Sequence, residues 1–386
     1  MRQTLPQAFR LHFSDETLED LRDRLKRVRW PDEPPAAHWS TGSSVAYMRD
    51  LVAYWRDGFD WRAQEAALNT FRQFKVPLGG IALHFIHEEG KGPDPMPLLL
   101  SHGWPGSIVE FLKLVPMLTD PAHFGADPAD AFTVVAPSLP GYTLSFAPGQ
   151  KRFGVDAISE LFASLMTDVL GYRRFAAQGG DWGAFISSRL AYQFPERLIG
   201  IHLNYLAAVR RDPNMLKNPT AEEKAFLDQL NHWLKEETGY SSIQGTKPNT
   251  LAFGLTDSPA GLAAWIVEKF HSWTDCGGTI ETAVTRDEML TNITLYWAAG
   301  AIGSSFWPYY DRLHSGWPIP EGARIETPTG YAEFPKEILR PPRSVAERVY
   351  ANIQRWTVMK KGGHFAALEQ PEALAQEIRA FFRPLR

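Results

Sequence analysis

The chain has very little cysteine, with Cys276 as the single example in 386 residues, which excludes an intramolecular disulfide framework. A composition of this kind is typical of a reducing compartment, so we expect a cytoplasmic protein. Uncharged apolar runs of about 18 residues are absent, and the first residues lack the apolar core of a signal peptide. We therefore expect no membrane anchor.

Basic residues are not in excess either, because 40 Lys and Arg stand against 44 Asp and Glu, for a net charge of -4. Without a basic field to attract phosphate backbones, nucleic acid is not an expected partner. Hydrophobic residues make up 44% and charged residues 22%, the proportions of an ordinary globular protein. A chain of this length buries a large core and forms one enlarged domain or two.

The first 75 residues carry three helical patterns. Ser14 can cap a helix whose apolar residues share one face over 18–28, before Trp30 and Pro31. A second apolar stripe covers 45–55, and Asp60 can cap a third helix. These patterns predict an N-terminal helical layer.

After residue 75, short apolar runs alternate with helical patterns, separated by glycine and proline. This rhythm predicts an α/β fold with a mostly parallel central sheet flanked by helices. The expected strands are 81–87, 98–101, 132–136, 175–178, 198–203 and 356–359, and the expected helices include 158–170, 184–193 and a C-terminal helix at 371–382.

Between about residues 204 and 305 the strand rhythm stops, and helical segments such as 221–237 and 260–270 predict an inserted helical cap. The strand pattern resumes near Arg324. We therefore expect four parts: the N-terminal layer at 1–75, a first core part at 76–203, the cap at 204–305 and a second core part at 306–386.

Residues 179–183, with the sequence GGDWG, follow an apolar strand and open a helix. This matches the nucleophile-elbow pattern G-x-S-x-G with Asp181 in place of serine. Such a turn holds its central residue in strained backbone geometry, and glycines avoid clashes with the neighbouring strand and helix. The alternative is a glycine-rich loop whose aspartate caps a helix.

Residues 101–106, SHGWPG, come directly after another predicted strand, where this type of fold places half of its oxyanion hole. The backbone N–H groups of Trp104 and Trp182 are the predicted donors, since an ester carbonyl becomes an anion when water attacks it. The alternative is an ordinary His-Gly turn before a helix.

His364 lies in the loop GGHF, which follows the last predicted strand. With Asp181 before it and a carboxylate between them, the chain order is nucleophile, acid, base. The acid would accept the Nδ1 proton of the histidine and stabilise its imidazolium form. Residue chemistry leaves four candidates for it, namely Glu321, Glu326, Glu333 and Glu337.

Over nearly its whole length the chain resembles the microsomal-type epoxide hydrolases, including those that act on insect juvenile hormone. The segments that carry the resemblance are HGWPGS, GGDWG, ETGYSSIQGTKPNT at 237–250, LTDSP at 255–259, PTGYAEFPKE at 328–337 and KGGHFAALEQP at 361–371. The resemblance implies an α/β-hydrolase fold, an N-terminal domain that wraps the core, and no metal or organic cofactor. It also places the acid at Glu337.

Two cap phenols of that family donate hydrogen bonds to the epoxide oxygen. By motif, the resemblance places one on Tyr240 in ETGYSSIQ and the other on Tyr309 in SSFWPYYDR. Tyr310 is adjacent and is the alternative for the second phenol, and Trp307 stands where the family has a basic residue.

The function that follows is hydrolysis of an apolar epoxide to a vicinal diol through an ester on Asp181, with water activated by His364 and Glu337. Epoxide and water are the expected partners, and the sequence leaves open whether the protein forms a homo-oligomer. One alternative is a haloalkane dehalogenase, which uses the same aspartate chemistry. Another is a binding protein without turnover, whereas a serine esterase is disfavoured because no serine occupies the elbow.

Overall fold

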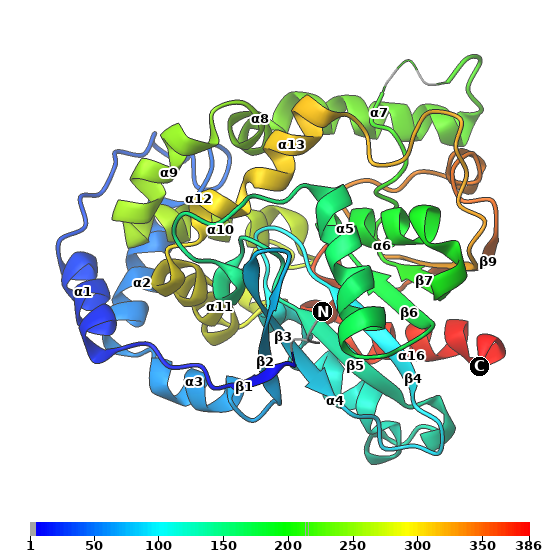
Figure 1. Ribbon diagram of the computed structural model, residues 1–386. Helices are drawn as coiled ribbons and strands as arrows, with labels where there is room; N and C mark the ends of the chain where they lie inside the picture. The colour runs from blue at the N-terminus through cyan, green and yellow to red at the C-terminus, as the bar shows by residue number, and fades with distance from the viewer. Residues whose placement is uncertain (1–4, 213, 215) are drawn as a thin grey trace.

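The computed structural model describes residues 5–212, 214 and 216–386, and its centre is a nine-stranded mixed sheet. The strand order is β1-β2-β3-β5-β4-β6-β7-β8-β9 (Figure 1). The strands β1, β2, β3 and β5 pair antiparallel, and the remaining pairs are parallel. Their bounds are β1 Gln7–Phe9, β2 Gln73–Leu78, β3 Ile81–Glu88, β4 Met96–Ser101, β5 Phe132–Pro137, β6 Phe175–Gly179, β7 Leu198–Leu203, β8 Thr329–Glu333 and β9 Ile353–Val358.

The six strands expected from the sequence are confirmed within a few residues, as are the mostly parallel pairing and the flanking helices. Two strands, β1 and β2, were missed, and β8 lies in the region after Arg324 where the strand pattern was expected to resume without stated bounds. The strand β1 is a partly exposed edge strand of three residues, too short for an alternating pattern. The strand β2 contains Pro77 and the half-buried Lys75, which mask its β pattern. The region 1–75 is therefore not helical throughout, because β1 and the start of β2 lie within it.

Side chains on the central strands alternate between two buried clusters, one on each face of the sheet. On β4, Leu99 belongs to one cluster, whereas Leu98 and Leu100 belong to the other. The first face is covered by α5 (Val155–Ser164), its π-helical continuation Leu165–Val169 and α6 (Asp181–Gln193). The second face is covered by α4 (Leu114–Thr119) and α16 (Pro371–Phe382). Burial on both faces fits the continuously apolar central strands.

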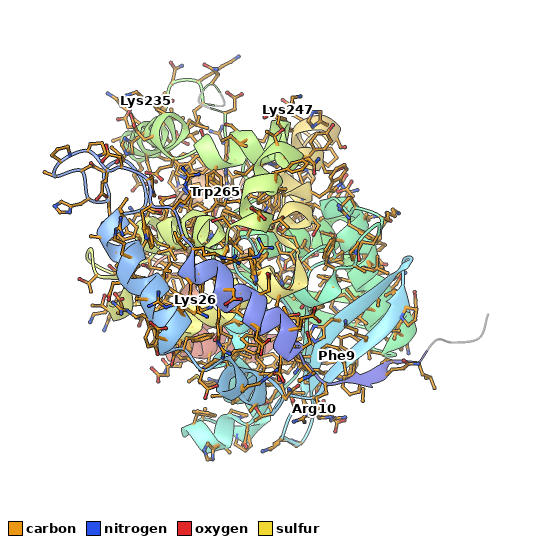
Figure 2. The ribbon with its side chains drawn as sticks, turned by 90° about the vertical axis from the view of Figure 1, so that its left-hand side faces the viewer. Phe9, Arg10, Lys26, Lys235, Lys247 and Trp265 are labelled. Atoms are coloured by element: carbon orange, nitrogen blue, oxygen red, sulfur yellow. The ribbon has the colours of Figure 1, made fainter. Side chains whose placement is uncertain are left out.

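Three N-terminal helices lie beside the cap, namely α1 (Asp15–Lys26), α2 (Val45–Asp57) and α3 (Trp61–Leu68). The predicted caps are confirmed, since the Ser14 side chain accepts from the N–H of Thr17 and that of Asp60 from the N–H of Ala63. In Figure 2 the blue N-terminal helices lie in front of the yellow-green helices of the cap. The layer therefore supports the cap and also adds β1 to the sheet.

The segment between β7 and β8 is helical and covers one end of the sheet (Figure 1). Its helices are α7 Ala221–Glu236, α8 Gly239–Thr246, α9 Pro248–Asp257, α10 Pro259–Trp273, α11 Arg286–Ala299, α12 Ile302–Ser305 and α13 Trp307–Ser315. The helical run thus continues through α13, which packs side by side with α8. Between β8 and β9 lies the short α14 (Arg343–Ala346), and α15 (Ala366–Glu369) precedes α16. In the described part of the chain, no helix has the length and apolarity needed to cross a membrane.

Candidate active site

Asp181 is the first residue of α6 and follows β6 through Gly180. Its φ of 45° lies in the left-handed region, which is strained for a residue with a side chain. A Cβ on Gly179 would lie 2.2 Å from the carbonyl oxygen of Gly183, and one on Gly183 would lie 1.8 Å from that of Ser101. The tight, glycine-dependent turn expected from the sequence is therefore present.

The loop after β4 carries Trp104 directly to the Asp181 carboxylate. The Trp104 N–H donates to Asp181 Oδ1 at 2.8 Å. Gly103 fits against the same side chain, because a Cβ there would lie 2.3 Å from Asp181 Oδ1. The N–H of Trp182 belongs to the first turn of α6, whose N–H groups have no partner within the helix. Both predicted donors thus adjoin the aspartate.

His102 holds the loop after β4 in place through hydrogen bonds to the backbone. Its Nε2 accepts a hydrogen bond from the N–H of Leu139 at 3.1 Å, so this nitrogen carries no proton. Burial lowers the pKa of His102 to about 4, which keeps the ring neutral near pH 7. The histidine of the SHGWPG motif is therefore a structural support of the loop.

His364 lies between two carboxylates. Its Nδ1 is 2.6 Å from Glu337 Oε1, and its Nε2 is 3.4 Å from Asp181 Oδ2. The side chains of Glu337 and His364 are 0% and 2% exposed, against 15% for Asp181. Glu337 Oε1 also accepts the N–H of Ile338 at 2.7 Å, which fixes the carboxylate in place.

Among the four candidate acids, Glu337 contacts His364. Glu321 and Glu326 are exposed, and Glu333 accepts the indole N–H of Trp356 at 3.0 Å. Sequence chemistry could not separate the four, because each precedes His364 and each could be a surface charge. The parallel bridge between Lys336 and Gly363 is what brings Glu337 beside the histidine loop.

The charge state of His364 follows from its surroundings. Burial by itself lowers the pKa of the imidazole, but the carboxylates of Glu337 and Asp181 raise it to about 10. The folded protein with a free Asp181 therefore holds His364 as an imidazolium. The loss of either carboxylate charge would lower this pKa.

A carboxyl group that sequence reasoning missed, that of Glu369, holds the histidine loop. It accepts backbone hydrogen bonds from Gly363 at 2.9 Å, Phe365 at 3.0 Å and Asp275 at 2.8 Å. The N–H of His364 donates to the carbonyl of Trp273, the last residue of α10, at 2.8 Å. The cap therefore helps to position the histidine.

The rings of Tyr240 on α8 and Tyr309 on α13 contact each other and the two tryptophans that adjoin Asp181. Their ring centroids lie 5.7 Å apart, and the two residues are 6% and 5% exposed. The Tyr240 ring stacks on Trp104 at 5.3 Å, and the Tyr309 ring packs edge-on against Trp182 at 4.8 Å. Burial raises the pKa of both phenols, so they remain protonated donors.

Tyr310, the alternative second phenol, faces elsewhere. Its ring stacks on Trp307 at 4.8 Å and on His314 at 4.0 Å, along the other side of α13. Adjacent residues on a helix point about 100° apart, so one of the two tyrosines can face Tyr240. The structure brings Tyr309 to that position.

Two cations that the motifs did not reveal interact electrostatically with Tyr240, and Lys269 also lies over its ring. Lys269 on α10 places Nζ 4.5 Å from the Tyr240 ring centroid and forms an ion pair with Glu268. Arg211 lies over the rings of Trp233 at 4.5 Å and Tyr205 at 5.4 Å. Positive charge near a phenol favours its ionised form and any oxyanion beside it.

A carboxylate on a strained elbow, a buried His–Glu pair and a backbone donor from the β4 loop are features of the α/β-hydrolase fold, here with aspartate at the elbow. Comparison with known proteins agrees. Residues 6–111 match the family model described as epoxide hydrolase N terminus, and residues 96–244 match the alpha/beta hydrolase fold.

A putative epoxide hydrolase of Stigmatella aurantiaca is 42% identical over 98% of this chain and 85% of its own length. Epoxide hydrolase 1 of Sus scrofa is 37% identical over 97% of this chain and 87% of its own. The crystal structure of juvenile hormone epoxide hydrolase from Bombyx mori superposes with a TM-score of 0.84 at 31% identity, covering 99% and 94% of the two chains. The chain belongs to the epoxide hydrolase family of α/β hydrolases.

Proposed function

We propose that this protein hydrolyses an epoxide to a vicinal diol through a covalent ester on Asp181. The observation that carries the proposal is the set of groups around the Asp181 carboxylate, which lies 3.4 Å from Nε2 of His364 and interacts electrostatically with the paired phenols of Tyr240 and Tyr309. A carboxylate is ionised near neutral pH and can open an sp³ carbon, whereas a serine would first have to lose its proton. Family membership supports the same chemistry.

In the first step, an oxygen of Asp181 bonds to a ring carbon while the carbon–oxygen bond of the epoxide breaks. The leaving oxygen takes a proton or a hydrogen bond from Tyr240 and Tyr309. Their raised pKa values keep these phenols protonated until the alkoxide develops. Tyr309 is preferred to Tyr310 because its ring faces Tyr240 and Trp182.

Ester formation itself prepares His364 for the second step. The ester removes the negative charge of Asp181, one of the two charges that raise the pKa of His364. The imidazolium can then pass its proton to the phenolate left by the first step and act as a base toward water, held in orientation by Glu337. The water attacks the ester carbonyl, and the N–H groups of Trp104 and Trp182 stabilise the resulting oxyanion.

The walls of the site favour an apolar substrate. Trp104, Trp182 and Trp273 surround the nucleophile and the two phenols with aromatic surface. The proposal also places the reaction in the cytoplasm, which the single cysteine, free and buried, supports.

Product formation by the purified protein tests the proposal. Aryl, alkyl and long-chain epoxides are offered beside haloalkanes, and we expect diols that disappear in Asp181→Ala but persist in Asp228→Ala, the same change on an exposed part of α7. In His364→Gln the ester should accumulate as an increase in protein mass equal to the epoxide. Halide release without diol would show that the protein is a dehalogenase. Turnover by Asp181→Ala would show that Asp181 is not the nucleophile.

A further inference from the structure

Glu110 is a buried acid beside the active site for which the mechanism above has no use. It lies in the 3₁₀ turn Ile108–Phe111, which follows the loop that carries Trp104. This turn packs against α15, which begins two residues after His364. Glu110 therefore lies between the loop that contacts Asp181 and the segment that carries the histidine.

The side chain of Glu110 folds back toward the nucleophile. Its Oε1 lies so close over Gly106 that a Cβ there would be 1.6 Å away, and Gly103 donates a backbone hydrogen bond to the carboxyl. The same Gly103 packs against Asp181, since a Cβ on it would lie 2.3 Å from Asp181 Oδ1. One glycine thus separates the two carboxyl groups.

Glu110 has no cation partner among the described residues, and its electrostatic neighbours are His364 and Asp181. Burial raises its pKa to about 8, so the carboxyl is mainly protonated near pH 7. Protein surrounds the side chain, yet part of the residue remains accessible to water. A buried carboxyl group without a charged partner requires further hydrogen-bond partners, and a water molecule can supply one.

We infer that Glu110 positions the water molecule that hydrolyses the Asp181 ester, an inference that rests on the proposed function. The water oxygen bonds to Cγ of Asp181, one proton passes to Nε2 of His364, and the second O–H donates to a carboxyl oxygen of Glu110. The carboxyl keeps its own proton. When the ester bond breaks, the departing diol oxygen takes the proton from His364. Glu110 is therefore a positioning residue and not a proton carrier.

Single-turnover kinetics with Glu110→Leu and Glu110→Gln separate this role from a structural one. In Glu110→Leu the ester should form at the normal rate and hydrolyse about 10- to 100-fold more slowly, since a hydrogen bond to the reacting water is lost. Consequently kcat and KM should fall together, while kcat/KM is unchanged. Glu110→Gln should recover most of the rate, because its amide oxygen still accepts from water.

Glu372→Leu, the same change on the exposed surface of α16, should leave both steps unchanged. Normal ester hydrolysis in Glu110→Leu would overturn the inference alone. Equal slowing of both steps with a lower melting temperature would assign Glu110 a structural role, and a glutamine variant no better than leucine would also contradict water positioning. If the wild-type protein forms no ester, the proposed function fails first and this inference fails with it.

Discussion

Replacing Glu337 by glutamine removes the buried charge that His364 uses while preserving the size of the side chain. The carboxylate is 0% exposed and lies 2.6 Å from Nδ1 of the imidazole. Glutamine can still accept one hydrogen bond from Nδ1, but it carries no negative charge to stabilise the positive charge of the imidazolium. We therefore expect Glu337→Gln to fold, to form the Asp181 ester and to hydrolyse that ester slowly.

The size of the effect follows from the pKa of His364. Its increase from 6.5 to about 10 corresponds to about 5 kcal/mol of preference for the imidazolium form. Asp181 and Glu337 share this stabilisation, and after ester formation Glu337 alone supplies it. Because the charge of Glu337 is the largest of the contributions that raise this pKa, we assign it about 3 to 4 kcal/mol of the total, which predicts that ester hydrolysis slows by about 10² to 10³-fold.

Rapid-quench mass spectrometry measures the two steps separately. Ester should appear within one turnover in Glu337→Gln, remain as the main enzyme form, and decay at the reduced rate. Glu333→Gln is the matched control, because Glu333 contacts Trp356 and not His364. An ester decay rate within a few fold of the wild type would refute the charge argument, since it would show that His364 functions without its buried partner.

Three other changes test separate parts of the account. Single Tyr240→Phe and Tyr309→Phe variants should each lose about 10-fold in the rate of ester formation and the double variant about 10³-fold, whereas a double variant with a near-normal rate would exclude the phenols as donors. Gly183→Ala places a Cβ 1.8 Å from a carbonyl oxygen of β4, so urea unfolding should show a loss of about 3 kcal/mol or more, and unchanged stability would contradict the elbow geometry. Because the pKa of His364 is raised from 6.5 to about 10, its charged form contributes stability that is complete below pH 6.5 and lost as the pH rises to about 10. The wild type should therefore lose its stability advantage over His364→Gln across this interval, and a constant difference would argue against the raised pKa.

Local patterns account for the parts of this molecule that the sequence predicted well. The central strands are continuously apolar because both sheet faces are covered, and Ser14 and Asp60 begin helices through contacts within three residues. The turn at Asp181 is also determined by nearby residues, since its glycines avoid clashes within one strand, one turn and one helix. Such features depend on neighbours in the chain.

Contacts between distant segments account for what the sequence did not predict. The strand β1 forms by pairing with β2, and the paired residues are more than 60 positions apart in the sequence. Glu369 and Glu110 have no signature by themselves, and their surroundings come from the cap and from the loop after β4. The motif resemblance favoured Tyr309 over Tyr310, but residue types alone did not separate the two, because the choice depends on the rotation of α13 against α8.

Isotope transfer from water shows whether the reaction passes through a covalent ester on Asp181. A single turnover with excess enzyme is run in water enriched in oxygen-18, and the diol and the peptide that contains Asp181 are analysed by mass spectrometry. We expect an unlabelled diol, because its new oxygen comes from the Asp181 carboxylate, together with label in the Asp181 side chain. Label in the diol from the first turnover, with none in Asp181, would contradict the ester and show that water attacks the epoxide directly.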